Sequence, residues 1–309
     1  MAPIATSLTQ LLGNTPMREP VRYLKEQGCS ARLLLKLECF NPLGSVKDRL
    51  ALGLIEDAEQ QGLLKPGGVI IEPTGGSAGI SLAFVGRIHG YRVIITMPDI
   101  PGGERRSLLK ALGAEVVLTP ASRGMQGAIR KAEELAATIP GAYIPRQFDN
   151  QANPQIHRRT TAQEILRDTE GHVDVFVAGV GTGGTLTGIA EVLKEHNPAI
   201  KVVAVEPADS PVLSGGKSGA HKLQGIGAGF TPPVLNQEIY DEVMAVRNDE
   251  AFEACRVMAH TEALLLGVSA GAALHAATQL ARRAEYRGKT IVSVMPDTGE
   301  RYLSSNLFD

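Results

Sequence analysis

Short apolar runs alternate with helical patterns along almost the whole chain, and this alternation limits the possible folds more than any other feature of the sequence. The runs are continuously apolar, as is typical of strands that are buried on both faces of a parallel sheet. They span residues 33–37, 69–71, 93–97, 116–118, 173–178, 202–205 and 291–294. Such β/α alternation predicts an α/β fold with open, mostly parallel twisted sheets that are flanked by helices.

Helical patterns fill the segments between these runs. In the first segment Val46, Leu50, Leu54 and Ala58 recur every fourth residue and therefore share one face of a helix. Further helices are predicted to begin near Ser77, Glu104, Gly124, Pro154, Thr185, Asp249 and Ala270. At about 150 residues per domain, 309 residues suit two sheets better than one. Because open α/β sheets bind ligands where strand ends meet helix N-termini, functional residues are expected in the loops that follow the strands.

Composition excludes several classes of function. The chain has 31 Lys and Arg against 33 Asp and Glu, a net charge of −2, which argues against nucleic-acid binding or a polybasic membrane patch. Three cysteines without CxxC spacing (Cys29, Cys39 and Cys255) are predicted to be free thiols in a reducing compartment. The seven histidines lack metal-site spacing, so no metal is expected. The first residues do not form a signal peptide, and no apolar run is long enough for a membrane helix, so a cytoplasmic protein is expected.

Residues 179–185, Gly-Val-Gly-Thr-Gly-Gly-Thr, follow a buried strand and lead into a helix. Glycines let the backbone approach an anion, and the first-turn amides lack intrahelical partners at the positive end of the helix dipole. A phosphate suits such a loop. A plain strand-to-helix turn is the simpler interpretation. The stretch also matches G-x-G-x-x-G, with Glu206 ending the next strand, so a dinucleotide site competes with the phosphate interpretation.

Lys47 is predicted to lie in the first turn of a helix, where the dipole disfavours a cation. Burial and the dipole both favour the neutral amine, which Schiff-base chemistry requires. Alone, a lysine followed by Asp48 and Arg49 more often belongs to a solvated charge cluster. The combination with residues 179–185 and a second loop of Thr, Gly and Ser at residues 74–79 favours the chemical interpretation.

From Leu12-Gly13-Asn14-Thr15-Pro16 to Gly299-Glu300-Arg301-Tyr302-Leu303, the chain resembles cysteine synthase (O-acetylserine sulfhydrylase), a fold-type II family of pyridoxal-phosphate enzymes. The resemblance implies a tryptophan synthase β-like fold and a homodimer. It implies a larger cofactor-binding domain (residues 1–40 and 152–309) and a smaller, mobile substrate domain (residues 41–151).

The resemblance also implies residue roles. Lys47, in Ser45-Val46-Lys47-Asp48-Arg49, would bind pyridoxal 5'-phosphate as an internal aldimine and remove the substrate's α-proton. Ser269 would bond the pyridine nitrogen, and a neutral hydroxyl there favours β-elimination and replacement. The implied cofactor-binding residues are Lys47, Ser77, Gly181, Thr182, Gly183, Gly184, Thr185, Ser269 and Asp297. The implied substrate-binding residues are Thr74, Gly75, Gly76, Ser77, Ala78, Gln147 and Gly225.

Simpler interpretations exist for three of these residues. Ser269 could be a helix N-cap, Gln147 a residue of a surface loop, and Asp297 a turn residue.

The sequence departs from the family pattern at the substrate side. The family's loop typically reads Thr-Ser-Gly-Asn-Thr-Gly, whereas this chain has Thr74-Gly75-Gly76-Ser77-Ala78-Gly79. Three of the side chains that would contact cofactor and substrate oxygens are replaced, so at least two hydrogen-bond donors are lost. Residues 98–106, Pro-Asp-Ile-Pro-Gly-Gly-Glu-Arg-Arg, stand where the family has a methionine-serine sequence before Glu-Arg-Arg. Two glycines there would make the rim of the site more flexible or let a larger ligand approach.

The expected activity is β-replacement on an activated L-serine through an aminoacrylate, with O-acetyl-L-serine and sulfide giving L-cysteine and acetate. Synthesis of another β-substituted alanine is one alternative. A nicotinamide-dependent oxidoreductase and a cofactor-binding regulatory homologue without turnover are others. The expected partners are an amino-acid substrate, a small nucleophile, a second copy of the chain and the C-terminal tail of a serine acetyltransferase.

Overall fold

The computed structural model describes residues 4–99 and 103–309, and it divides the chain into two compact units. Unit 1 contains residues up to Leu12 and Lys47–Ala152, and unit 2 contains Gly13–Val46 and Asn153–Asp309. Residues 4–12 therefore group with the smaller unit and residues 41–46 with the larger, whereas the sequence interpretation placed them the other way round. The assignment of cofactor binding to one unit and of mobility to the other stays a prediction.

Unit 1 is built on a four-stranded parallel sheet in the order β5-β4-β3-β6. Its strands are β3 (Val69–Pro73), β4 (Arg92–Pro98), β5 (Glu115–Thr119) and β6 (Ala142–Tyr143). Its helices are α2 (Lys47–Gln60), α3 (Ser77–Ile88), α4 (Gly103–Ala111) and α5 (Gly124–Thr138). Of the predicted apolar face of the first helix, Leu50, Leu54 and Ala58 are buried on α2, whereas Val46 is buried but precedes the helix, which begins at Lys47.

Unit 2 has a six-stranded sheet in the order β1-β2-β10-β7-β8-β9, in which β1 alone is antiparallel among the strands of the described residues. Its strands are β1 (Met17–Arg18), β2 (Arg32–Leu37), β7 (Val175–Gly179), β8 (Lys201–Pro207), β9 (Glu242–Val246) and β10 (Thr290–Met295). Its helices are α1 (Val21–Glu26), α6 (Ala152–Arg159, whose first residue belongs to unit 1), α7 (Thr161–Asp168), α8 (Gly184–His196), α9 (Asn248–Glu262) and α10 (Val268–Arg282).

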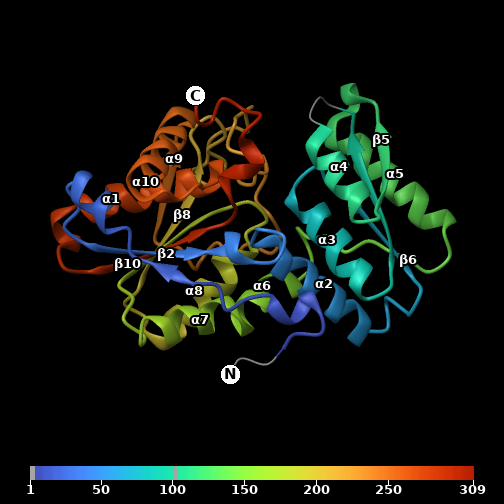
Figure 1. The fold of residues 1–309 in the computed structure, drawn as a ribbon, viewed down its shortest axis with the longest axis horizontal. Coiled ribbons are helices and arrows are strands. Elements are labelled where there is room, and N and C mark those ends of the chain that lie inside the picture. Colours follow the sequence, from blue (N-terminus) through green and yellow to red (C-terminus); the bar gives the residue numbers. More distant parts are fainter. Residues whose placement is uncertain (1–3, 100–102) are drawn as a thin grey trace. The chain divides into compact units, whose positions relative to one another are not determined.

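Helices cover both faces of this larger sheet, which explains the continuously apolar strands. In Figure 1, α9 and α10 lie on one side of it and α7 and α8 on the other. Val175 and Val177 pack toward α9 and α10, whereas Phe176 and Ala178 pack toward α7 and α8. A strand packed in this way has no solvent-facing residue, so apolar residues follow one another directly. The expectation of two mostly parallel sheets with helices on their faces is confirmed.

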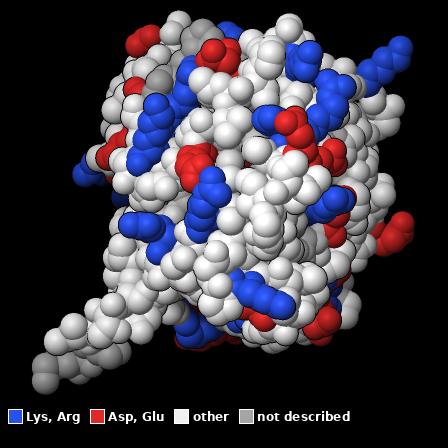
Figure 2. Space-filling view, turned by 90° about the vertical axis from the view of Figure 1, so that its right-hand side faces the viewer, with Lys and Arg blue, Asp and Glu red and all other residues white. Residues whose placement is uncertain are grey.

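Other expectations from composition can be compared with the structure. All three cysteines are free, as predicted. On the face shown in Figure 2, acidic and basic side chains are interspersed among uncharged residues. Within the described ranges, no helix combines the length and apolar character needed to cross a membrane. The same residues contain no group of three or more His, Cys, Asp or Glu that could hold a metal ion.

Candidate cofactor and substrate sites

The loop of residues 179–185, here called the glycine loop, connects β7 to α8 in unit 2. Gly183 is the N-cap of α8 and has a φ of +88°, a left-handed conformation that favours glycine. The amides of the first turn of α8 therefore have no side-chain cap from this residue and face the end of the sheet. Thr182 is buried beside them. This arrangement provides N–H donors and a hydroxyl at the positive end of a helix, as an anion site requires.

A second loop, Gln224–Gly227, packs directly on the glycine loop. The Gly227 amide donates to the Val180 carbonyl at 2.9 Å. A methyl group added at Gly181 would lie 2.2 Å from the Gly225 carbonyl oxygen, and one at Gly179 would lie 2.7 Å from an Ile226 methyl carbon. The glycines at these positions are therefore required by the close approach of two backbone segments.

Helix α6 supports the glycine loop from another side through two polar side chains. The Asn153 amide donates to the Thr182 hydroxyl at 2.9 Å, and a methyl group at Gly184 would lie 1.9 Å from the Asn153 amide oxygen. Buried His157 places Nε2 3.2 Å from the Thr185 hydroxyl and Nδ1 2.9 Å from the Thr161 hydroxyl.

Sequence reasoning missed His157 as a functional candidate. The available signal was its position four residues after Asn153, a spacing that places the two polar side chains on one face of a helix.

Ser269 is buried within the first turn of α10, and Gly267 is the N-cap of that helix. The interpretation of Ser269 as a helix cap is therefore wrong. Among the described residues, no hydrogen bond uses the Ser269 hydroxyl, and a methyl group at Gly225 would lie 3.3 Å from its oxygen. Ser269, Gly225 and the glycine loop thus converge at one edge of the larger sheet.

Asp297 follows β10 at the same edge and is buried, so it is not an exposed turn residue. Its carboxylate accepts a hydrogen bond from the Tyr302 hydroxyl at 2.8 Å. Its backbone pairs with Ser45, and the adjacent Pro296 carbonyl accepts from the Val46 amide at 2.8 Å. The chain segment that ends just before Lys47 is therefore fixed to the end of β10.

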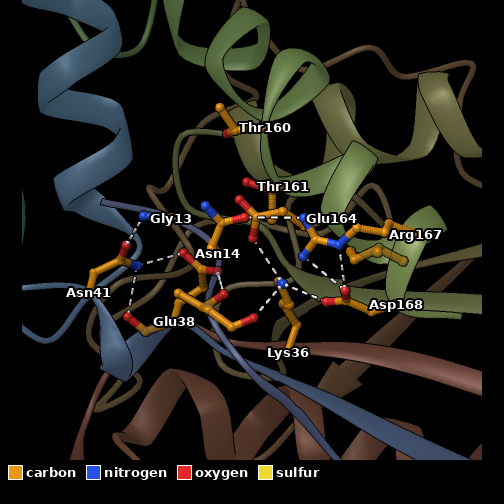
Figure 3. A network of polar contacts seen from close by, with 12 residues as sticks. Gly13, Asn14, Lys36, Glu38, Asn41, Thr160, Thr161, Glu164, Arg167 and Asp168 are labelled. Atoms are coloured by element: carbon orange, nitrogen blue, oxygen red, sulfur yellow. Dashed lines mark hydrogen bonds and ion pairs between the residues drawn. The ribbon is translucent and has the colours of Figure 1, made fainter. Parts of the chain in front are cut away.

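A buried polar network holds residues 36–41, where the chain segment that leads to Lys47 begins (Figure 3). Lys36, fully buried on β2, lies 2.9 Å from a Glu164 oxygen and donates to the Thr15 carbonyl at 2.6 Å. The Glu38 carboxylate accepts from the Thr15 hydroxyl at 2.7 Å and from the Asn41 amide at 2.8 Å. Because buried charges must be paired, this network belongs to the framework of unit 2.

Lys47 is the first residue of α2, as predicted from the sequence. Its neighbours Asp48 and Arg49 are buried, and the Ser81 hydroxyl donates to Asp48 at 2.6 Å. A solvated charge cluster at this position is therefore wrong.

The loop of residues 74–79, here called the threonine loop, lies between β3 and α3 in unit 1. The Gly76 amide donates to the Thr74 hydroxyl at 3.3 Å, and Arg105 donates to the Gly75 carbonyl at 3.2 Å. A methyl group at Gly76 would meet nothing within 4 Å. Ala78 instead belongs to a buried apolar cluster with Leu50, Leu54 and Ala152.

Gln147 is buried at the same end of the smaller sheet as the threonine loop, so the surface-loop interpretation is wrong. Its side-chain amide donates to Glu72 at 3.1 Å, and Glu72 lies on β3 two residues before Thr74. Sequence reasoning missed Glu72. Its only signal in the sequence was an acidic residue directly after the apolar run 69–71 and two residues before Thr74.

The acid of the competing dinucleotide interpretation is already engaged. The Glu206 carboxylate is buried and accepts from the Leu213 amide at 2.7 Å, the Ser214 amide at 3.1 Å and the Ser214 hydroxyl at 2.5 Å. It therefore holds the loop after β8, which removes the acid that a ribose would need.

Comparison with known proteins decides the family. Residues 8–297 match the family model described as pyridoxal-phosphate dependent enzyme. This chain belongs to that family. It is 52% identical over 303 residues to a cysteine synthase of Staphylococcus aureus, covering 98% of this chain and 96% of the relative.

Solved structures of similar proteins support the same assignment. A cysteine synthase of Entamoeba histolytica matches with a TM-score of 0.96 at 41% identity, covering 99% of this chain and 91% of that one. An O-ureido-L-serine synthase matches with a TM-score of 0.95 at 42% identity, covering 99% and 96%. The protein is therefore an enzyme with a pyridoxal 5'-phosphate cofactor, and the oxidoreductase alternative is wrong.

The residues of unit 2 fit this cofactor. The amides at the start of α8, with the hydroxyls of Thr182 and Thr185, can hold a phosphate. The Ser269 hydroxyl, buried and without a hydrogen bond among the described residues, can pair with a ring nitrogen.

Proposed function

We propose that the protein catalyses β-replacement on O-acetyl-L-serine, with sulfide as the nucleophile and L-cysteine and acetate as products. The observation that carries the proposal is a buried hydroxyl, Ser269, beside an intact glycine loop, in a chain 52% identical to a cysteine synthase. A neutral hydroxyl at the ring nitrogen favours elimination and replacement at the β-carbon over transamination.

When bound, the cofactor supplies an electron sink for negative charge that forms at the α-carbon of an amino acid. The proposal assigns its phosphate to Gly181, Thr182, Gly183, Gly184 and Thr185. Ser269 would donate to its ring nitrogen, Asp297 borders the same edge of the sheet, and Ser77 would contribute a hydroxyl from unit 1.

Lys47 has two roles in the proposal. Its side-chain amine would hold the cofactor through the aldehyde carbon. Once the substrate's amine has taken that place, the released Nζ would accept the proton from the substrate's α-carbon. The start of α2 supports both roles, because the positive end of a helix dipole disfavours a protonated amine.

The substrate is assigned to the threonine loop, residues Thr74, Gly75, Gly76, Ser77 and Ala78, together with Gln147 and Gly225. Gly75 and Gly76 carry no donor side chain, so the amides at the start of α3 bind the carboxylate. Gln147 adds a side-chain amide from the same end of the sheet.

A second candidate is synthesis of a different β-substituted alanine. It is favoured by the open space at Gly75 and Gly76 and by the similarity to O-ureido-L-serine synthase. In both candidates the chain forms a homodimer in the cytoplasm, and the tail of a serine acetyltransferase is a candidate partner. The resemblance to cysteine synthases supports these assignments.

Two measurements test the proposal. Borohydride reduction followed by peptide mass spectrometry is expected to find the cofactor on Lys47, and Lys47→Ala is expected to lose turnover. A modified peptide with another lysine would contradict the assignment. Product analysis with O-acetyl-L-serine and either sulfide or hydroxyurea separates the two candidates, because only sulfide gives L-cysteine. A holoenzyme with neither reaction would contradict both.

A further inference from the structure

Glu72 is a buried carboxylate at the end of β3 for which the proposed reaction has no role. Its residue is 2% exposed. The carboxylate accepts hydrogen bonds from the Gln147 side-chain amide at 3.1 Å and from the Arg146 backbone amide at 3.3 Å. The Gln147 backbone amide donates to it as well. Three N–H groups from two consecutive residues therefore converge on one carboxylate.

These bonds hold a backbone conformation that would otherwise be unfavourable. Arg146 has a φ of +54°, which residues other than glycine rarely adopt. Such a conformation persists when the surrounding contacts fix it. Here the amide of Arg146 is held by Glu72, 74 residues earlier in the chain, while its carbonyl accepts from the Asp149 and Asn150 amides. The turn at Arg146 determines the direction in which Gln147 leaves the backbone.

The same carboxylate fixes the orientation of the Gln147 side chain. One N–H of its amide is used by Glu72, which sets the plane of the amide group. Glu72 also lies two residues before Thr74, so the bond ties Gln147 to the strand that leads into the threonine loop. Two segments assigned to the substrate carboxylate therefore share one anchor.

We infer that Glu72 is a positioning residue for the substrate carboxylate, and that its protonation releases the Arg146–Gln147 turn and weakens substrate binding. This inference rests on the proposed assignment of Gln147 and the threonine loop to the substrate. It adds a pH-dependent control of substrate binding, which the reaction itself does not require.

The surroundings of Glu72 make this control effective near neutral pH. Burial raises the pKa of Glu72 to about 7, and the N–H groups of Arg146 and Gln147 oppose the rise. The positive charge of the Arg146 guanidinium also opposes the rise in the pKa of Glu72. The neighbouring Tyr143 has its pKa raised to about 12, by burial first and then by the charges of Asp57 and Glu72. A protonated carboxyl has one fewer acceptor oxygen for its three donors, so the turn loosens as the pH falls through 7.

The first test compares Glu72→Gln with the parent holoenzyme. Glutamine keeps the size and one acceptor but faces the Arg146 or Gln147 amide with an NH₂ group. At pH 8.5 we expect KM for O-acetyl-L-serine to rise about tenfold, with kcat within about twofold, the effect of one lost hydrogen bond to a charged group. At pH 6 the difference in KM should disappear. Equal KM values at both pH values would overturn the inference.

Two further variants separate positioning from general damage. Glu59→Gln is a matched control, because Glu59 also accepts from two side chains in unit 1, Tyr91 and His89, and it should leave KM unchanged. In a Gln147→Ala background, Glu72→Gln should raise KM by less than about twofold, because Glu72 acts through Gln147. Independent, multiplicative effects of the two substitutions would contradict the inference.

The second test does not depend on the proposed function. In ¹⁵N-labelled holoenzyme without substrate, the amide signals of Arg146 and Gln147 should shift with pH, with a midpoint near 7, and the shift should be absent in Glu72→Gln. A midpoint near that of an ordinary glutamate, or a shift that persists in the variant, would overturn the inference. If the amides titrate as expected but O-acetyl-L-serine is not turned over, the proposed function fails and the device at Glu72 stands.

Discussion

The glycine loop and the threonine loop both connect a parallel strand to a helix, but they differ in how closely neighbouring atoms pack against their glycines. In the glycine loop, a methyl group at Gly181 or Gly184 would lie 2.2 or 1.9 Å from a neighbouring oxygen. In the threonine loop, a methyl group at Gly75 would lie 3.9 Å from Met97, and one at Gly76 would meet nothing within 4 Å. Glycine is a packing requirement in the first loop, whereas in the second Gly75 and Gly76 leave open space and only at Gly79 would a methyl group come close to a neighbour, 3.0 Å from a Thr74 methyl carbon.

The difference separates what the chain retains from what it can vary. The glycine loop is enclosed by α6 and by residues 224–227, so a change there disturbs several partners at once. The threonine loop has room for larger side chains at Gly75 and Gly76, the positions next to its proposed substrate contacts. A retained cofactor site and an adjustable substrate site follow from the packing of the two loops.

The strongest test of the comparison restores side-chain donors to the threonine loop. We expect Gly75→Ser with Ser77→Asn to raise kcat/KM for O-acetyl-L-serine with sulfide by about tenfold to a few hundredfold, because one or two hydrogen bonds to charged groups are recovered. Adding Ala78→Thr completes the family pattern.

Ala78→Thr alone is the control for this test and should give no gain, since Ala78 is buried with Leu50 and Leu54. Steady-state kinetics measure the effect. A parent that already turns over as fast as an ordinary cysteine synthase, with no gain in the double variant, would show that the open loop does not limit this substrate.

Adding a methyl group to the enclosed glycine loop should weaken cofactor binding. Gly181→Ala places a methyl group against the Gly225 carbonyl, a backbone atom that cannot rotate away. We expect cofactor affinity to fall about 10- to 100-fold, the effect of overpacking by about 1–3 kcal/mol. Titration of the apoenzyme with pyridoxal 5'-phosphate, followed by visible absorbance, gives the Kd. Cofactor affinity equal to that of the parent would remove the distinction between the two loops.

The third prediction concerns the support of the glycine loop. His157→Asn shortens the side chain that connects the hydroxyls of Thr185 and Thr161, and so leaves buried polar groups with fewer partners. We expect about tenfold weaker cofactor binding, with the ³¹P signal of the bound phosphate displaced. His172→Asn is the control, because His172 contacts only the nearby Thr169 carbonyl among its described hydrogen bonds. A normal ³¹P signal in His157→Asn would assign His157 to folding alone.

Local patterns predicted the framework because burial on both faces leaves a direct signature in the sequence. The run at residues 33–37 corresponds to β2, and the run at 202–205 to the centre of β8. Strand β9 was missed because it lies at the edge of the sheet, and most of its residues are partly exposed. Helix α7 was missed because it is short and because only Thr160 separates it from the end of α6 at Arg159.

The site was predictable only where one segment carries the information. The glycine loop, Lys47 and Ser269 each lie within a local motif at the start of a helix. The pairs Glu72–Gln147 and Asn153–Thr182 join residues 75 and 29 positions apart, and so depend on which strand ends meet in the folded protein. Apolar periodicity reveals that two segments are buried but does not reveal which polar side chains face each other.

The smallest expected effect is that of Gly75→Ala, which tests the open loop with the substitution already used in the enclosed one. Gly75→Ala is the same substitution as Gly181→Ala, but its methyl group enters open space, 3.9 Å from the Met97 methyl carbon. Gly75 does not have a positive φ, so alanine adopts its backbone conformation without strain. Because alanine has less backbone freedom in the unfolded chain, we expect the free energy of unfolding to rise by about 0.4–1 kcal/mol. Cofactor affinity should not change. Urea unfolding of the holoenzyme variants, monitored by circular dichroism, measures the difference. A loss of stability in Gly75→Ala as large as that in Gly181→Ala would mean that both loops are equally enclosed, and the contrast between a fixed cofactor site and an adjustable substrate site would fail.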